Sequence, residues 1–340
     1  MGHLKNVLPL PVSLTPQEEH ILSAMRVRYF SLYLNRAQEQ RKAYQLIRGI
    51  DVMNISSDCV PCLLKRVLFQ ARLADNDSEF NALSAALSTF SEEYEEGRNS
   101  AEVATAVHTV AYKAMGISDP YKGLKIIADE VAGNLLDKAQ EYVESSDNRL
   151  RAAMTVAIIG NIMDFGQTTS IDHPDLFTDL FEELLEQGID SDDTEIVEEC
   201  LRKPGDILYV FDNSGESQLD KILIRELKSR GKHVIGVVRG APILNDVTME
   251  DASRSGLDKE LDDIISTEKF AIGIPMKIEK DLSEALSKTS FIIAKGMANF
   301  ESMEGRDFGV PVAFLLRAKC VPVANALGVD VGTNVARVAV

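Results

Sequence analysis

The chain has 340 residues, of which 45% are hydrophobic and 26% are charged, and its formal net charge is -17. This length is enough to bury a large core and to form two domains. A strongly acidic surface repels a phosphate backbone, which argues against nucleic acid as a partner, although local cations or a metal ion could still hold a small phosphorylated molecule. The 4 cysteines are too few for a disulfide scaffold. No apolar run reaches the roughly 18 to 20 residues that a membrane span needs.

The N-terminal segment, residues 1–53, differs from the rest of the chain. Its first apolar stretch is short and is interrupted by Pro9 and Pro11, so it makes a poor signal peptide and we expect a cytoplasmic protein. Residues 25–49 are basic and have the spacing of an amphipathic helix. We interpret residues 1–53 as a helical extension that packs on the surface or binds a partner. Whether it belongs to the native protein is not fixed by the sequence.

A helical domain is predicted for residues 54–200. Apolar residues recur at steps of three and four in segments 62–74, 80–94, 102–116, 123–146 and 149–166. The strongly acidic stretch 176–199 is typical of a solvated helix and loop.

An α/β domain is predicted for residues 201–340. The apolar runs DILYVFD, HVIGVVRG, TSFIIAKG and PVAFLLRAKC have the length of buried strands, and segments of helical period separate them. This alternation indicates a doubly wound, mainly parallel sheet flanked by helices. Such a sheet carries its working residues at the carboxyl ends of its strands.

Polar side chains follow three of the predicted strands at the point where each strand ends. They are Asp212, Asn213 and Glu216 after the first strand, Arg239, Asn245 and Asp246 after the second, and Lys295, Asn299 and Glu301 after the third. The opposite strand ends read KPGD, RGK and LSKT, which lack this combination. Each group alone would fit an ordinary turn with a helix cap. Because the carboxyl ends of parallel strands share one edge of a sheet, their joint placement favours a site.

The chemistry of these residues suits a divalent metal ion and a phosphate group. Asp212, Asn213 and Asp246 offer hard oxygen ligands, which magnesium and manganese prefer. The metal would hold a phosphate oxygen and lower the pKa of a bound water. Lys295 would supply a point charge for the phosphate, and Glu216 would orient a water or a ligand side chain. Ser214 stands where a haloacid-dehalogenase phosphatase would need a second Asp, so attack by metal-activated water is favoured over an aspartyl-phosphate route.

Three motifs together resemble one known family. DNSGES at 212–217, VRGAPILNDVT at 238–248 and AKGMANFE at 294–301 are similar to the motifs of the damage-control phosphatases, also known as domain of unknown function eighty-nine. CVPC at 59–62 and GNIMDFG at 160–166 resemble the CxxC-containing branch common in archaea and bacteria. The resemblance runs from about residue 54 to the end of the chain.

The resemblance implies a divalent-metal-dependent phosphatase that acts on small phosphorylated metabolites, such as sugar phosphates or damaged metabolites. It implies magnesium, manganese, cobalt or nickel as the cofactor. The implied metal ligands are Asp212, Asn213 and Asp246, and the implied residues for phosphate or substrate are Lys295, Arg239, Asn299, Asn161 and Asp164. The substrate, the preferred metal and the oligomeric state stay open at this level.

Two other functions remain as alternatives. One branch of the family is described as a carboxyl methyltransferase that uses S-adenosylmethionine, but no glycine-rich G-x-G loop follows the first strand of the predicted α/β domain. A non-catalytic metal-binding module is the other alternative. Cys59 and Cys62 are compatible with a structural or lid role and with a redox or metal role.

Overall fold

The computed structural model describes residues 53–165 and 173–340. The predicted amphipathic helix at 25–49 lies outside these residues. Met53, the first described residue, is buried and belongs to the hydrophobic core. None of the described helices combines the length and apolar character required to cross a bilayer.

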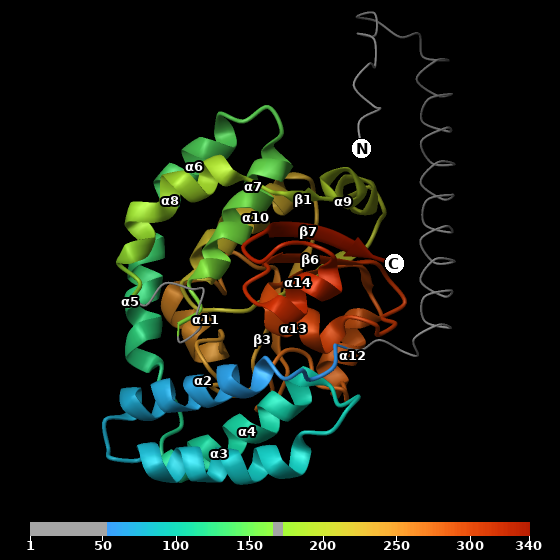
Figure 1. Ribbon diagram of the computed structural model, residues 1–340. Helices are drawn as coiled ribbons and strands as arrows, with labels where there is room; N and C mark the ends of the chain where they lie inside the picture. Colours follow the sequence, from blue (N-terminus) through green and yellow to red (C-terminus); the bar gives the residue numbers. More distant parts are fainter. Residues whose placement is uncertain (1–52, 166–172) are drawn as a thin grey trace, which may run out of the picture. The chain divides into compact units, whose positions relative to one another are not determined.

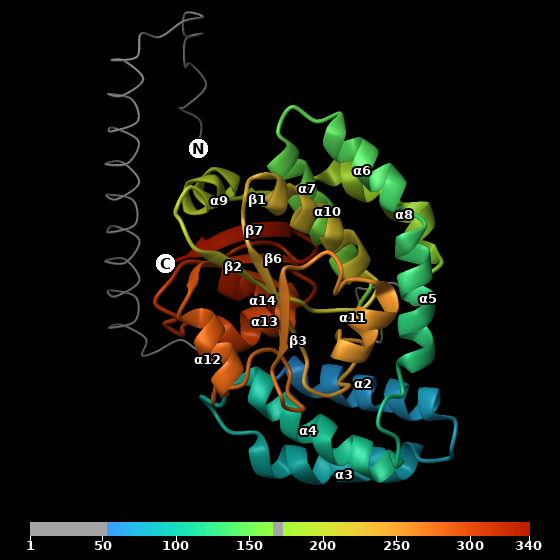
Figure 2. The ribbon, with the colours of Figure 1, turned by 180° about the vertical axis from the view of Figure 1, so that it is seen from behind.

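The first part of the described chain is helical, as predicted. Its helices are α2 (Cys59–Ala74), α3 (Glu79–Glu93), α4 (Ser100–Met115), α5 (Lys122–Gly133), α6 (Leu136–Glu144), α7 (Arg149–Ile159), the 3-10 turn η1 (Gly160–Ile162), α8 (Leu176–Gln187) and α9 (Thr194–Leu201). Figures 1 and 2 both show α2, α3 and α4 together below the sheet. The segment 123–146 forms two helices rather than one: α5 ends at Gly133 and α6 begins at Leu136, with Asn134 and Leu135 between them.

Within the described residues, one sheet of seven strands has the order β1-β7-β6-β5-β2-β3-β4. The strands are β1 (Ser191–Asp192), β2 (Asp206–Val210), β3 (Val234–Val238), β4 (Asp263–Ser266), β5 (Thr289–Lys295), β6 (Val312–Arg317) and β7 (Asn334–Ala339). Neighbouring strands run parallel except for β6 and β7, which are antiparallel. The predicted fold class, a mainly parallel α/β sheet flanked by helices, is therefore confirmed.

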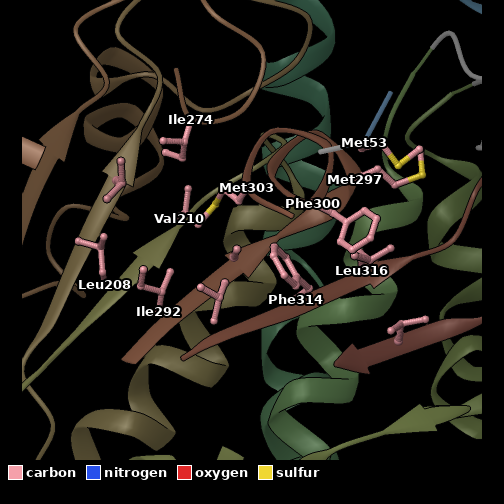
Figure 3. Packing of buried hydrophobic residues seen from close by; sticks show 14 of the residues in the cluster. Met53, Leu208, Val210, Ile274, Ile292, Met297, Phe300, Met303, Phe314 and Leu316 are labelled. Atoms are coloured by element: carbon pink, nitrogen blue, oxygen red, sulfur yellow. The ribbon is translucent and has the colours of Figure 1, made fainter. Parts of the chain in front are cut away.

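Helices cover both faces of the sheet because the strand side chains alternate in direction. Leu208 and Val210 of β2 join a core with α12 (Lys280–Leu286), α13 (Gly296–Met303) and α14 (Val321–Leu327). Figure 3 shows this core, in which Phe300 of α13 meets Phe314 of β6 edge to face with ring centroids 5.1 Å apart. The opposite face of β2 meets α10 (Glu216–Ser229), where the Tyr209 hydroxyl donates to Asp220 at 2.8 Å.

The described residues up to Ala339 pack as one compact unit. Helices α7 and α10 pack against each other across the boundary predicted at residue 200. The division into a helical and an α/β domain stays a prediction.

Strand β2 has β5 on one side and β3 on the other, which makes it a topological switch point of the sheet. Chain connections leave the carboxyl ends of such neighbouring strands in opposite directions and open a crevice there. The fold thus brings three of the four sequence-predicted strand ends together, with α11 (Met249–Ser255) beginning after the long loop that follows β3.

Candidate active site

A cavity of about 190 Å³ lies at this edge of the sheet. Its floor includes Asp212 and Asn213 after β2 and Asp246 after β3. Helices α2 and α4 form another wall, and residues of α13, of the first turn of α14 and of several loops also line the cavity. The lining residues from these four helices are Cys59, Cys62, Leu63, Arg66, Ser100, Ala104, His108, Met297, Ala298, Glu301, Val321 and Pro322.

Asp212 is the residue at the centre of this edge. Its side chain is buried, and Oδ2 accepts hydrogen bonds from the amides of Asn213 at 2.9 Å and Asn161 at 3.2 Å. Oδ1 is buried and accepts no hydrogen bond in the described chain, although the Arg239 guanidinium nitrogen Nη2 lies 3.6 Å from it as an ion pair. Burial, together with the charges of Asp246 and Glu216, raises the pKa of Asp212 well above its ordinary value. One oxygen of Asp212 is thus fixed in direction by two hydrogen bonds, whereas the other accepts no hydrogen bond from a described residue and has the Arg239 charge nearby.

Gly296 allows the close approach of β5 to Asp212. It has a φ of +73°, in the region that favours glycine. A Cβ atom at this position would lie 1.8 Å from Asp212 Oδ2 and 2.9 Å from the Asn161 amide nitrogen. The glycine of the AKG motif therefore makes room for the aspartate of the neighbouring strand.

The loop after β3 brings Asp246 to Asn213. The two residues form an isolated antiparallel bridge, and the Ser214 backbone N–H donates to the Asn245 carbonyl at 2.8 Å. Asp246 Oδ2 accepts from Arg239 Nε at 2.6 Å. Burial raises the pKa of Asp246, although the Arg239 charge opposes this shift.

Arg239 and Asn299 lie behind the cavity wall. Both side chains are buried, and the Arg239 guanidinium also donates to Asn299 Oδ1 at 3.0 Å. Asn299 in turn donates to the carbonyls of Phe211 at 2.9 Å and Lys295 at 2.7 Å. These two residues tie the ends of β2, β3 and β5 together, and neither lines the cavity.

Glu216 and Lys295 form a second buried group below Asp212. Glu216 Oε2 accepts from the amides of Asn213 and Asn161, each at 2.9 Å. Its other oxygen pairs with the Lys295 ammonium, which also meets Asp220 Oδ1 at 2.9 Å. Neither Glu216 nor Lys295 lines the cavity. The structure places the predicted water-orienting and phosphate-binding residues one layer behind the predicted ligands.

Asp164, after η1, lines the cavity, whereas Asn161 does not. Its two oxygens accept from Arg66 of α2 at 2.8 Å and from Lys319 at 2.8 Å. Burial alone would raise the pKa of Asp164, but the charges of Arg66 and Lys319 hold it below its ordinary value. Arg66 and Lys319 are absent from the sequence-predicted set. A usable signal for Arg66 was its position one helical turn after Cys62.

The predicted ligand set fits a hard divalent cation. Within residues 53–165 and 173–340, no three His, Cys, Asp or Glu side chains are grouped so as to hold a metal ion. The predicted set instead contains two carboxylates and one amide, from Asp212, Asp246 and Asn213. Asp212 Oδ1 is buried next to a second carboxylate and accepts no hydrogen bond from a described residue, an arrangement that a cation would stabilise.

Three cysteines contribute to the cavity wall: Cys59, Cys62 and Cys320. All three are free thiols, and burial raises the pKa of each, to about 12 for Cys320. A raised pKa lowers the thiolate fraction and so disfavours a nucleophilic role. Whether Cys59 and Cys62 act structurally or in redox chemistry stays a prediction.

Comparison with known proteins assigns the chain to a family. Residues 55–335 match the family model described as the damage-control phosphatase ARMT1-like domain. The chain belongs to this family. The predicted resemblance is therefore confirmed, whereas membership of the CxxC-containing branch stays a prediction.

Relatives of this damage-control phosphatase family match nearly along their whole length. The chain is 38% identical over 289 residues to a damage-control phosphatase of Archaeoglobus fulgidus, covering 84% of this chain and 99% of that protein. It is 31% identical over 289 residues to a damage-control phosphatase of Pyrococcus horikoshii, covering 83% and 97%. The crystal structure of a DUF89 family protein from Pyrococcus horikoshii superimposes with a TM-score of 0.74 at 30% identity and covers 83% of this chain and 98% of that one.

Proposed function

We propose that the protein is a divalent-metal-dependent phosphatase that hydrolyses small phosphorylated metabolites, including sugar phosphates and damaged metabolites. Family membership supports phosphatase chemistry. The observation that carries the metal dependence is Asp212 Oδ1, which is buried beside Asp246 in the cavity lining and accepts no hydrogen bond from a described residue. The cavity volume, about 190 Å³, is suited to a small metabolite.

Three side chains would hold the ion: Asp212, Asn213 and Asp246. An ion bound there, magnesium, manganese, cobalt or nickel, would supply a Lewis acid for a phosphoryl oxygen and would activate a water. Both amide hydrogens of Asn213 are used, one toward Asp212 at 2.9 Å and one toward Glu216 at 2.9 Å. The amide oxygen of Asn213 accepts no hydrogen bond from another described residue, so it is available as a ligand.

The groups behind the ligands fix their orientation. Asn161 bridges Asp212 and Glu216, and Arg239 holds one oxygen of Asp246 at 2.6 Å. Such supporting contacts are worth roughly 10- to 100-fold in metal affinity or activity in known metal sites. The other oxygen of Asp246 has no hydrogen-bond partner among the described residues and is left for the ion.

The decisive experiment is a panel of phosphate esters assayed with magnesium, manganese, cobalt and nickel. We expect metal-stimulated hydrolysis of p-nitrophenyl phosphate and of a subset of sugar phosphates. Asp212→Ala and Asp246→Ala should each abolish it. Asp147→Ala, at an exposed position between α6 and α7, is the matched control and should retain full activity. Full activity in folded Asp212→Ala would disprove the proposed metal site.

A further inference from the structure

The cations around the cavity differ in how many of their donors are already used. Lys295 is completely buried, and its ammonium donates to the Ala157 carbonyl at 2.8 Å and pairs with Glu216 and with Asp220 at 2.9 Å. An ammonium group has three N–H donors. All three donors of Lys295 therefore have a protein acceptor, and the side chain does not line the cavity.

Arg239 is also committed to the protein. Its Nε donates to Asp246, and its Nη2 donates to Asn299 and lies 3.6 Å from Asp212 Oδ1. Its Nη1 is buried without a hydrogen-bond partner among the described residues, and only 1% of the side chain is exposed. It stands behind Asp246, outside the set of residues that line the cavity. Arg239 orients a predicted metal ligand and has no open path to a substrate.

Arg66 differs from both of these cations because it lines the cavity beside Asp212 and Asp246. One of its guanidinium donors, on Nη2, reaches Asp164 Oδ1 at 2.8 Å. Within the described part of the chain, Arg66 makes this one side-chain hydrogen bond. Because a guanidinium has five N–H donors, the other donors of Arg66 are not used by the described part of the protein. Some buried side-chain atoms of the described residues have no hydrogen-bond partner, and no atom of Arg66 is among them. The nitrogens that carry these donors therefore keep some accessible surface, and the residue lines the cavity.

The orientation of Arg66 is fixed from behind. Asp164 Oδ1 accepts from the guanidinium nitrogen Nη2, and Lys319 donates to the other oxygen of Asp164 at 2.8 Å. A planar guanidinium held at one nitrogen can present its other donors as a fork, which matches two oxygens of a phosphoryl group. Arg66 is 6% exposed, so this fork operates in a site shielded from bulk water, where charge-assisted hydrogen bonds are strong.

We infer that Arg66, on helix α2, binds the phosphoryl oxygens of the substrate opposite the ligands Asp212 and Asp246. This inference rests on the proposed phosphatase function and assigns to Arg66 the phosphate contact that the sequence motifs had suggested for Lys295. It also means that helix α2 contacts the substrate directly, because Arg66 is on this helix and lines the cavity.

Calorimetric titration with inorganic phosphate tests the inference without relying on turnover. The full chain is titrated in the presence and absence of manganese, as wild type, Arg66→Gln, Arg66→Lys and Arg72→Gln. Arg72 lies on the same helix with 63% of its side chain exposed, and it is the matched control. We expect phosphate affinity to fall about 10- to 100-fold in Arg66→Gln and less in Arg66→Lys, which keeps the charge but loses the fork. Arg72→Gln should match the wild type.

Steady-state kinetics with p-nitrophenyl phosphate provide the second measurement. Loss of a binding contact should raise KM in Arg66→Gln at least as strongly as it lowers kcat. Wild-type phosphate affinity in folded Arg66→Gln would overturn the inference. If Arg66→Gln proves unfolded in a thermal melt, Arg66→Lys decides: unchanged affinity overturns the inference and a several-fold loss supports it.

Failure of the proposed function gives a different result. If the wild type hydrolyses no phosphate ester with any of the four metals, the phosphatase proposal fails. The phosphate affinities of the variants still test whether Arg66 binds phosphate. Conversely, turnover that depends on Asp212 together with unchanged phosphate binding in Arg66→Gln would keep the phosphatase and reject the role of Arg66.

Discussion

Lys295 and Glu216 form an ion pair in which both side chains are completely inaccessible to solvent. Asp220 adds a second carboxylate to the same ammonium, at 2.9 Å. Burial opposes the charged form of Lys295, but the two carboxylates more than offset this and raise the pKa of Lys295 above its ordinary value. The ammonium therefore stays charged and holds Glu216, whose other oxygen orients the amides of Asn161 and Asn213.

Replacing this ammonium should destabilise the whole protein. Lys295→Met leaves Glu216 and Asp220 buried without a cation, and breaking a buried pair in this way costs about 3–5 kcal/mol. Chemical denaturation should show this loss in the free energy of unfolding. Lys280→Met is the control, since 83% of the Lys280 side chain is exposed, and it should change stability little. A Lys295→Met protein as stable as the wild type would contradict the structural role of this ion pair.

The gathering of Asp212, Asn213 and Asp246 could be predicted from the sequence. Each residue follows an apolar run of strand length, and parallel strands put their carboxyl ends at one edge. That topological rule needs no knowledge of distances. It also placed Lys295 at the correct strand end, but it could not show that Asp220, on the helix that follows β2, would pair with the Lys295 ammonium.

The position of Arg66 could not be predicted in the same way. Periodicity identified α2 as a helix, but which face of a helix meets a distant sheet edge depends on tertiary packing. The strands β1, β4 and β7 were missed for a related reason. Strand β1 has 2 residues and β4 has 4, so neither carries a readable period, and β7 pairs antiparallel with β6 outside the expected alternation.

Gly296 provides a test of the geometry around Asp212. Gly296→Ala would place a methyl group 1.8 Å from Asp212 Oδ2, so Asp212 must move. We expect the variant to lose at least about 100-fold in metal-dependent activity, since the ligand itself is displaced. Gly328→Ala is the matched control, because Gly328 has a similar φ of +69° but open space around it.

Both substitutions place alanine in the left-handed region, which costs about 1–2 kcal/mol. Comparison of their thermal melts and specific activities separates backbone strain from displacement of Asp212. Equal activity in the two variants would show that Asp212 tolerates the added methyl group.

Metal binding should be visible as a change in stability. An ion that binds only the folded chain stabilises it by about 2.7 kcal/mol at 100 times its Kd. We expect manganese to raise the Tm of the wild type by several degrees, EDTA to reverse the shift, and Asp212→Asn to show no shift. Because Asp212→Asn removes a buried charge beside Asp246, its metal-free Tm should equal or exceed that of the wild type. A manganese shift of wild-type size in Asp212→Asn would place the ion elsewhere.

His108, on the cavity wall, should make stability depend on pH. Burial, with a smaller contribution from the Arg66 charge, lowers the pKa of His108 to about 3 from its ordinary value of 6.5. Below pH 6.5, His108 therefore binds a proton in the unfolded chain but stays neutral in the folded chain. The stability conferred by the neutral imidazole is complete above pH 6.5 and is lost progressively as the pH falls toward 3.

Substitution of His108 should remove this pH dependence. One proton at 1.36 kcal/mol per pH unit predicts that the wild type loses about 2 kcal/mol between pH 7 and pH 5 through this residue. His108→Gln keeps a donor for Gln70, which contacts His108 Nδ1 at 3.0 Å, and should lose correspondingly less stability on acidification. His233→Gln, at a position with 52% of its side chain exposed, is the control and should retain the wild-type slope. Urea denaturation at the two pH values measures the free energy of unfolding of each variant. Equal losses of stability in the wild type and in His108→Gln would contradict the prediction. They would show that His108 is protonated in the folded protein as well, next to the charge of Arg66.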